Sequence, residues 1–457
     1  MDIVILGNGI SGITAARHIR KLSDHRITVI SKETDYFFSR TALMYMYMGH
    51  MRFEDTQPYE KGFWAKNRIK LIRGEVSMID FGQKKLQFAE NQHIHDTAFD
   101  PAPTEISYDR LVLALGSAPN KFGWPGQDLN GVQGLYSFQD LQSMEAHSKN
   151  LDRAVIVGGG LIGIEMAEMF HSRHIPVTLL VREQQYWNMV LPKEESAMVG
   201  EQIINAGIDL RLNTELKEII DDGQGNACAV LTNTDERIDC HFVGLTAGVH
   251  PNVGWLKDLG LDIDRGILTN EYLQTNIPDV WAVGDCAQLR KPPAGRRAIE
   301  AVWYVGRMMG ETAAYSICGQ EIAYDPGIWF NSAKFMDMEY QVYGTVLAKP
   351  PENQQSIFWQ SDDREKSIRL VFDAQSRAVI GFNLMGVRLR HEVCEKWIGA
   401  GTPLKDVVEQ LALASFDPEF TRHFHSQVVD IYNQRFGDHA IANKRRRFNQ
   451  VFSFLRN

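Results

Sequence analysis

A glycine triplet near the start of the chain, Gly7, Gly9 and Gly12, has the spacing of a phosphate-binding turn. It follows an apolar strand pattern, Ile3 to Leu6, and leads into a helical pattern, "ITAARHIRKL". In such a turn the first glycine permits the bend, the second lets a pyrophosphate approach the backbone, and the third lets helix and strand pack closely. The next strand pattern, "RITVIS", is followed by Glu33, which we expect to hold a ribose hydroxyl. Together these features predict a dinucleotide site.

The same fingerprint recurs in the middle of the chain at Gly158, Gly160 and Gly163, after the strand pattern "AVIV". A helical pattern and the strand pattern "PVTLLV" follow, and the acidic position after that strand is taken by Arg182, with Glu183 next. A guanidinium suits the 2′-phosphate of NADPH and a carboxylate suits the 2′-hydroxyl of NADH, so the pair leaves the preference open. Two complete fingerprints predict that the chain binds two dinucleotides.

Three further segments, in order along the chain, resemble those of the FAD-dependent pyridine nucleotide–disulphide oxidoreductases and their non-disulphide relatives. "LVLALGSAPN", which includes Gly116, resembles the segment that closes the first part of the FAD domain. "VGLTAGVHPN" resembles the strand where the chain leaves the NAD(P)H domain. "LQTNIPDVWAVGDCAQ" resembles the late FAD motif, whose aspartate, here Asp285, accepts a hydrogen bond from the ribitol of FAD. The resemblance covers about residues 1–319.

The order of these motifs implies an α/β fold with two Rossmann-like dinucleotide-binding domains, the NAD(P)H domain being inserted in the FAD domain. We expect an FAD-binding domain from residues 1–120 and 251–319, an NAD(P)H-binding domain over 121–250, and a C-terminal α+β interface domain over 320–457. A chain of 457 residues is too long for a single core. The aromatic stretch that opens the last domain fits core, a dimer interface or, at Trp329 or Phe330, a wall of the flavin site.

The resemblance implies hydride transfer from NAD(P)H to N5 of the flavin and leaves open where the electrons go next. In the family's disulphide reductases a redox cysteine pair follows the second strand, and its NADH oxidases and peroxidases have a single cysteine there. The corresponding stretch, Tyr36 to His50 ("YFFSRTALMYMYMGH"), contains no cysteine. Disulphide and sulfenate mechanisms are therefore not expected.

The ferredoxin and rubredoxin reductases of the family have a pattern like Y-x-x-R-P-x-L-[ST]-K in this region. The chain keeps Arg40 and Leu43, with Tyr36 one place earlier than the pattern has its tyrosine, but Tyr45 stands in place of the lysine. In those enzymes the lysine pairs with a glutamate close to flavin N5, and the glutamate is present as Glu165. We expect the Tyr45 hydroxyl to contact Glu165 or the flavin edge, the alternative being that Tyr45 only packs. Arg40 is expected to bind the FAD phosphates, which a guanidinium matches in geometry.

The helix that follows the late FAD motif is expected to aim its N-terminus at the N1/O2 edge of the flavin, as in the family, because reduced flavin carries charge there. Ala298 to Trp303 are the residues expected nearest the ring. The same loop carries a basic cluster, which is either a solvated loop or a docking surface for an acidic carrier protein. Its members are Arg290, Lys291, Arg296 and Arg297.

Bulk composition excludes several classes of function. The net charge of −9 argues against nucleic-acid binding. No run of about 18 apolar residues predicts a membrane span, and Met1 leads straight into a strand pattern rather than a signal peptide. The five cysteines are scattered singly, which fits a cytoplasmic setting without zinc. His423 and His425 come nearest to a metal-ligand pattern, and no metal is expected.

The final stretch, "NKRRRFNQVFSFLRN", joins four cations to apolar residues at helical spacing. It can lie on an anionic membrane surface, or dock on its own protein or a second subunit of a homodimer. The main hypothesis is an FAD-dependent NAD(P)H reductase that passes electrons to an external acceptor, such as a ferredoxin or rubredoxin. A membrane-surface quinone reductase is the alternative if the tail binds lipid. A low-turnover flavoprotein that senses NAD(P)H is the third, favoured by the missing lysine partner of Glu165.

Overall fold

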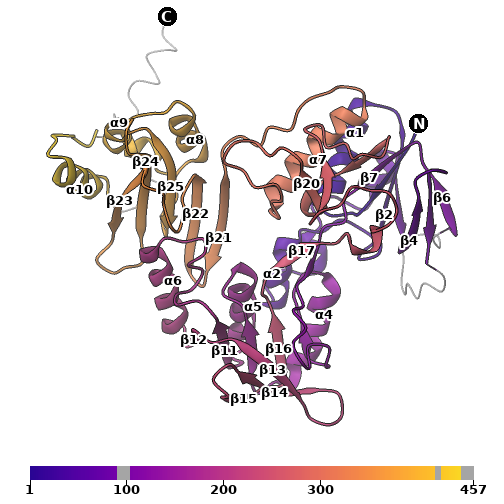
Figure 1. Ribbon diagram of the computed structural model, residues 1–457, viewed down its shortest axis with the longest axis horizontal. Coiled ribbons are helices and arrows are strands. Elements are labelled where there is room, and N and C mark those ends of the chain that lie inside the picture. The colour runs from indigo at the N-terminus through magenta and orange to yellow at the C-terminus, as the bar shows by residue number, and fades with distance from the viewer. Residues whose placement is uncertain (90–102, 417–423, 444–457) are drawn as a thin grey trace, which may run out of the picture. The chain divides into compact units, whose positions relative to one another are not determined.

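The computed structural model describes residues 1–89, 103–416 and 424–443 (Figure 1). It is a mixed α/β protein with parallel sheets, which confirms the predicted fold class. The chain divides into two units, of which the first is Met1–Arg182 with Asn213–Pro326 and the second is Glu183–Leu212 with Gly327–Asn457. The division into three domains by residue range stays a proposal. The basic tail and His423 lie outside the described residues.

The first sheet of the first unit is built on the apolar strand that precedes Gly7. Its order is β19-β7-β1-β2-β3 and all its neighbours run parallel. A strand from late in the chain thus lies beside one from the first part, as the order of the motifs implied. The helix that joins the first two strands is α1 (Ile10–Leu22). The strands are β1 (Asp2–Leu6), β2 (Arg26–Ser31), β3 (Ile69–Arg73), β7 (Arg110–Leu113) and β19 (Val280–Ala282).

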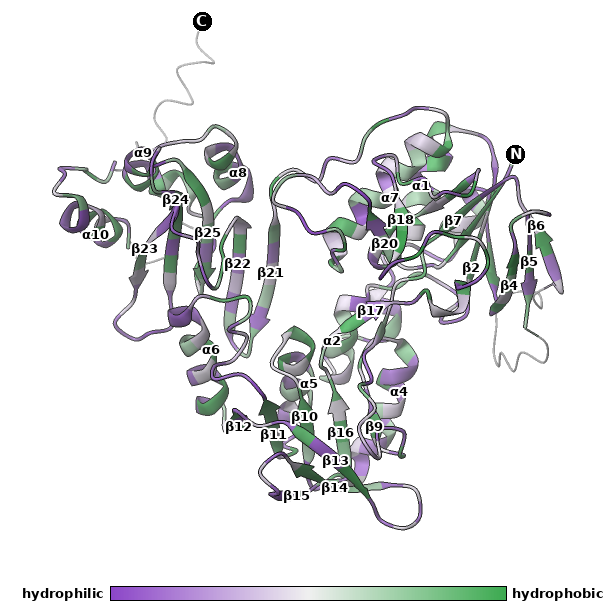
Figure 2. Cartoon of the chain, in the orientation of Figure 1, coloured by the Kyte–Doolittle hydropathy of each residue, from purple (hydrophilic) through white to green (hydrophobic). Residues whose placement is uncertain are grey.

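The same unit holds a second parallel sheet, built on the strand that precedes Gly158. Within this unit its strands run in the order β11-β10-β16-β9, and Figure 2 shows β10 and β11 to be hydrophobic along their length. An antiparallel sheet, β13-β14-β15, shares a buried core with β10 and β16. The elements are β9 (Val132–Gln133), α4 (Phe138–His147), β10 (Ala154–Val157), α5 (Leu161–Ser172), β11 (Val177–Val181), β13 (Leu216–Asp221), β14 (Ala227–Thr232), β15 (Arg237–Asp239) and β16 (Phe242–Leu245).

Further elements complete the first unit. Helix α7 (Trp303–Ile317) lies side by side with α1 (Figure 1). The two helices are so close that a Cβ added at Gly306 or Gly310 would come within 2.6 or 2.3 Å of Ser11 atoms. Glycine therefore lets these two helices approach closely. The other elements are η1 (Arg40–Ala42), α2 (Leu43–Tyr47), η2 (Phe53–Thr56), α3 (Gly62–Lys66), β4 (Val76–Asp80), β5 (Lys85–Phe88), β6 (Glu105–Ser107), β8 (Ser117–Pro119), η3 (Ser148–Asn150), β17 (Val249–Pro251), η4 (Gly254–Leu256), β18 (Ile267–Thr269), η5 (Gly284–Cys286) and β20 (Ala287–Leu289).

The second unit is centred on an antiparallel sheet in the order β21-β22-β25-β24-β23, with a large apolar core between the sheet and its helices. Among all the described residues, no helix has the length and apolar character needed to cross a bilayer. The elements are α6 (Lys193–Asn205), β12 (Asp209–Leu212), β21 (Phe330–Phe335), β22 (Met338–Gly344), β23 (Gln354–Gln360), β24 (Ser367–Asp373), β25 (Val379–Met385), α8 (His391–Gly399), α9 (Leu404–Gln410), η6 (Leu411–Ala414) and α10 (His425–Phe436).

A buried ion pair fastens α6 to this sheet. Glu195, in the first turn of α6, is fully buried, and its carboxylate accepts hydrogen bonds from Arg369 on β24 at 2.7 and 2.9 Å. Asn383 on β25 donates a third hydrogen bond to Glu195 at 3.1 Å, and Glu194 accepts a hydrogen bond from Arg369 at 2.7 Å. A charge buried this deeply is stable only while its partner is present.

Replacing Arg369 by methionine should therefore lower the free energy of unfolding by about 3–5 kcal/mol, because it leaves Glu195 charged and unpaired in the core. Urea denaturation of the purified protein measures this loss. The double variant Arg369→Met/Glu195→Met should recover most of it, since no buried charge remains. As a control, Arg364→Met breaks an exposed pair with Glu201 and should cost under about 1 kcal/mol. Equal losses in the two single variants would contradict the assignment.

Candidate functional site

The first glycine turn is packed tightly at two of its three glycines. Gly7 has a φ of +118°, and a Cβ there would lie 2.1 Å from the carbonyl oxygen of Ala114. A Cβ at Gly12 would lie 2.1 Å from the carbonyl oxygen of Gly7. A Cβ at Gly9, by contrast, would meet no atom within 4 Å. The fold itself therefore requires the first and third glycines, and the second leaves open backbone of the kind that a pyrophosphate approaches.

The second glycine turn repeats this arrangement. A Cβ at Gly158, whose φ is +129°, would lie 2.7 Å from the Thr246 carbonyl oxygen, and one at Gly163 would lie 2.3 Å from that of Gly158. A Cβ at Gly160 would meet no atom within 4 Å. Both turns thus fit dinucleotides, at the carboxyl ends of parallel strands where such ligands bind. Arg182 and Glu183 directly follow β11, which ends at Val181 at the same edge of the second sheet.

Glu33 and Arg40, predicted to bind ribose and phosphates of FAD, lie against each other. The Arg40 guanidinium donates to both Glu33 carboxylate oxygens, at 2.8 and 2.5 Å. Glu33 also accepts the backbone N–H of Phe138 at 2.9 Å, at the start of α4. The guanidinium therefore has a fixed position, and Glu33 balances its charge. The sequence predicted a role for each of these two residues but not the ion pair between them.

Asp285 lies in η5, directly after the last strand of the first sheet. Its carboxylate accepts hydrogen bonds from the Ser117 hydroxyl at 3.0 Å and the Tyr136 hydroxyl at 3.5 Å. Burial raises the pKa of Asp285, and the hydrogen bond from Ser117 and the charge of Arg40 oppose that rise. Gly116 has a φ of +67° and lies between Ser117 and the end of β7. These residues come from three separate stretches of the chain and meet at the edge of the sheet that carries Gly7.

Glu165 and Tyr45 lie on α5 and α2, two helices that are in contact. The contact includes the Tyr47 and Phe170 rings, 5.8 Å apart at 76°. Burial, and then the charge of Glu168, raise the pKa of Glu165 from its ordinary 4.5 to about 7. Within the described part of the chain no cation pairs with Glu165, and no hydrogen bond joins it to Tyr45, whose ring instead stacks on His50 at 6.2 Å. The predicted contact of the Tyr45 hydroxyl with Glu165 or the flavin edge therefore stays a prediction.

Trp303 is the first residue of α7, and Val302, which precedes it, provides no side-chain cap. The first N–H groups of this helix therefore have no capping side chain, as a site for negative charge requires. The predicted basic cluster on the preceding loop is only partly at the surface. Arg296 forms an almost fully buried ion pair with Glu300, and Arg290 pairs with Asp262. The prediction of four surface cations was therefore wrong for Arg296, whose charge serves the loop itself.

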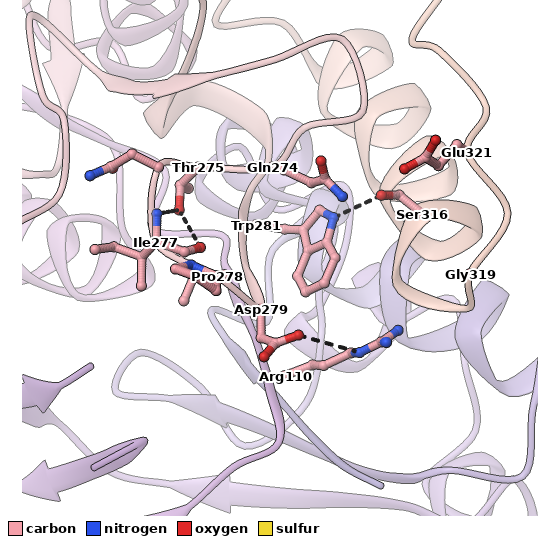
Figure 3. Close-up of a pocket in the computed structure, with 12 residues that line it drawn as sticks. Arg110, Gln274, Thr275, Ile277, Pro278, Asp279, Trp281, Ser316, Gly319 and Glu321 are labelled. Carbon is pink, nitrogen blue, oxygen red and sulfur yellow. Dashed lines mark hydrogen bonds and ion pairs between the residues drawn. The ribbon is translucent and has the colours of Figure 1, made fainter. Parts of the chain in front are cut away.

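A cavity of about 670 Å³ lies at the opposite edge of the first sheet (Figure 3). Arg110 and Val280 line it and stand at the amino ends of β7 and β19. Figure 3 shows the Trp281 indole donating to the Ser316 hydroxyl, at 3.0 Å. Dinucleotides bind at the carboxyl ends of parallel strands, so this cavity is separate from the glycine turns.

The chain is similar in sequence to known oxidoreductases and similar in fold to a solved one. A relative from a Sphingobium species, a 5,5'-dehydrodivanillate O-demethylase ferredoxin reductase subunit, is 30% identical over 76% of this chain and 82% of its own. An NADH oxidase of Methanocaldococcus jannaschii is 27% identical over 84% of this chain and 88% of its own. The structure of an NAD-dependent persulfide reductase from A. fulgidus has the same fold, with a TM-score of 0.81 at 22% identity, covering 96% of this chain and 84% of that one.

The family model described as pyridine nucleotide-disulphide oxidoreductase matches residues 1–310. That range contains both glycine turns and Asp285, the residues on which the resemblance rested. The family uses FAD together with NAD(P)H, and both turns fit a dinucleotide. The chain therefore belongs to the pyridine nucleotide-disulphide oxidoreductase family and is an FAD-dependent NAD(P)H oxidoreductase.

Proposed function

We propose that this enzyme passes electrons from NAD(P)H, through FAD, to a small redox protein of the ferredoxin or rubredoxin kind. The observation that carries the proposal is the lack of a reactive thiol along the flavin segment. Tyr36 to His50 contains no cysteine. Without a thiol beside the flavin to take up the electrons, the reduced FAD must pass them directly to an external acceptor.

Cys286 is the cysteine next to the FAD motif, and its chemistry supports this conclusion. It is fully buried, and its thiol donates to the carbonyl oxygens of Leu113 and Val283 at 3.4 Å. Burial raises the pKa of Cys286 to about 12. Because the thiolate is the reactive form, a buried thiol of this kind serves packing rather than electron transfer.

The residues divide the work of binding in this proposal. Gly9 and Gly160 let the pyrophosphates of FAD and NAD(P)H approach the two turns. Arg40 faces the FAD phosphates and Asp285 accepts from the ribitol. Hydride transfer is the chemistry that the two cofactors supply when bound. Glu165, on the helix after the second turn, has its pKa raised to about 7, so about half of it is protonated at neutral pH and this form can donate a hydrogen bond toward the reacting edge.

The Sphingobium relative supports a redox-protein acceptor, since its name states that it is a ferredoxin reductase subunit. The NADH oxidase relative represents the other outcome, in which oxygen takes the electrons. The resemblance places a cysteine beside the flavin in NADH oxidases, and this chain has none there. That difference favours a protein acceptor over oxygen.

One observation favours a second candidate, a low-turnover flavoprotein that senses NAD(P)H. Glu165 has no cationic partner in the described part of the chain, whereas the ferredoxin reductases pair it with lysine. Without that cation the enzyme stabilises developing negative charge on the flavin less well. This candidate predicts slow reduction of the flavin by both nicotinamide nucleotides.

Anaerobic stopped-flow spectroscopy distinguishes these functions. We expect one of NADH and NADPH to reduce the bound FAD within the turnover time, and the reduced enzyme to pass electrons to ferredoxin or rubredoxin faster than to oxygen. Slow reduction by both nucleotides would favour the sensor, and preferential reaction with oxygen would contradict a protein acceptor.

Tyr45→Phe is tested in the same way. An unchanged rate of flavin reduction would contradict a role for Tyr45 in the site.

Valine substitutions at the two open glycines should separate the two cofactors. Gly9→Val should weaken FAD binding by more than about 10-fold, and Gly160→Val should raise the KM for NAD(P)H while FAD stays bound, because each side chain would occupy only its own pyrophosphate site. Released-flavin fluorescence and steady-state kinetics measure the two effects. Gly12→Ala is the folding control, since its Cβ would overlap a carbonyl oxygen at 2.1 Å and should lower the Tm. Loss of FAD from Gly160→Val would contradict the assignment.

Glu165→Gln gives a signed pH prediction. Its pKa is raised from 4.5 to about 7 in the folded protein, so between these pH values the folded state holds a proton that the unfolded chain has released. The contribution of Glu165 to stability therefore falls as the pH rises from about 5 to about 7, and is constant above that range. The variant should lose this dependence, worth up to about 3 kcal/mol. Thermal unfolding at both ends of the range measures it, with the exposed Glu54→Gln as control, and equal pH dependence in wild type and Glu165→Gln would contradict it.

A further inference from the structure

Three residues of the predicted FAD site converge on a fourth, Tyr136. Arg40, Gly116 and Asp285 come from well-separated stretches of the chain, and each of them lies against this tyrosine. We propose that Tyr136 is a positioning residue of the FAD site, which holds Asp285 for the ribitol and Arg40 for the pyrophosphate. The inference rests on the proposed function, in which these two residues bind FAD.

The phenol hydroxyl connects the Gly116 turn to Asp285. It accepts the backbone N–H of Ser117 at 2.8 Å and donates toward the Asp285 carboxylate at 3.5 Å. A Cβ added at Gly116 would lie 2.5 Å from the same hydroxyl oxygen. The phenol thus occupies the room that a side chain at position 116 would fill. The Ser117 hydroxyl donates to the Asp285 carboxylate at 3.0 Å, and the longer contact from the phenol reaches the same oxygen, so the two groups together restrict the orientation of the carboxylate.

The face and the backbone of Tyr136 hold Arg40. The Arg40 guanidinium carbon lies 4.5 Å from the centre of the tyrosine ring, a cation–π contact. The same guanidinium donates a hydrogen bond to the Tyr136 carbonyl oxygen. Glu33 accepts two further hydrogen bonds from this guanidinium. A long side chain with several rotatable bonds is thereby restricted to one position, which lowers the entropy lost when it binds a phosphate.

The tyrosine is itself fixed by the start of helix α4. Its backbone N–H donates to Asp140 at 2.9 Å, and Asp140 and the N-cap residue Ser137 form a capping box. The next residue, Phe138, donates its backbone N–H to Glu33. Tyr136 is therefore anchored by a helix N-terminus rather than by a loose loop, as a group that orients others must be.

The protonation state of the phenol suits this role. Burial, and then the charge of Asp285, raise the pKa of Tyr136 to about 12. The hydroxyl therefore stays protonated through the physiological range and remains a hydrogen-bond donor toward Asp285.

Tyr136→Phe tests the proposal, because it keeps the ring over Arg40 and removes only the hydroxyl. FAD dissociation from the purified holoprotein, followed by flavin fluorescence, should show an affinity about 10-fold lower than that of wild type, with only a small fall in the Tm of the apoprotein, because the Ser117 N–H loses its acceptor. Tyr136→Leu removes the ring as well, and should weaken FAD binding further. The matched control is Tyr108→Phe, since Tyr108 is 4% exposed and its hydroxyl has no hydrogen-bond partner among the described residues. It should bind FAD as wild type does.

A double-mutant cycle shows whether Tyr136 acts through Asp285. Adding Tyr136→Phe to Asp285→Asn should cost less FAD affinity than adding it to wild type, because the carboxylate that the phenol orients is gone. Additive losses, or full FAD affinity in Tyr136→Phe, would overturn the inference. A drop in apoprotein Tm that accounts for the loss would also overturn it, as that would be a purely structural role. Failure of the wild-type protein to bind FAD would instead overturn the proposed function, so the two failures are distinguishable.

Discussion

The constraint on which the site depends is the absence of room for a Cβ where strand, turn and helix meet. At Gly7 and Gly12 a single added carbon would lie 2.1 Å from a backbone oxygen. This contact sets how close α1 lies to β1 and therefore where the helix N-terminus points. The second turn obeys the same constraint at Gly158 and Gly163, with added-carbon distances of 2.7 and 2.3 Å. In each turn the remaining glycine, Gly9 or Gly160, has space around it, and that space fits a ligand rather than being required by the fold.

The charged groups predicted to lie near the flavin are stabilised in different ways. Tyr36 to His50 lacks the cysteines and the lysine that related enzymes have next to the flavin, and none of the described residues supplies a substitute cation for Glu165. Burial raises the pKa of this carboxyl, which favours its protonated form and so lowers the cost of an unpaired buried charge. Arg40, in contrast, keeps its charge because Glu33 lies 2.5 Å away. Glu33 thus has a cation beside it, whereas Glu165 has none among the residues that the structure describes.

Local patterns predicted much of this architecture, and the parts they missed have a common reason. The glycine turns and Asp285 were found because their chemistry depends on spacing within about ten residues. Tyr136 was missed because its partner Arg40 is 96 positions away in the chain and Asp285 is 149 away. A signal was present in "SFQD", which matches a capping box and so placed the start of a helix directly after Tyr136. The basic loop was misjudged because the i, i+4 relation of Arg296 to Glu300 says nothing about burial.

The attachment of α6 determines which parts of the chain can be exchanged independently. Residues 183–212 fall within the range predicted for the NAD(P)H-binding domain, yet they belong to the same unit as the chain beyond Gly327. Glu195 and Arg369 are 174 positions apart and depend on each other for neutralisation. Replacing only the C-terminal region by one that lacks an arginine at position 369 would leave the buried carboxylate of Glu195 without its partner. The two segments therefore form one structural unit that is discontinuous in the chain, and a grafting experiment has to transfer both of them.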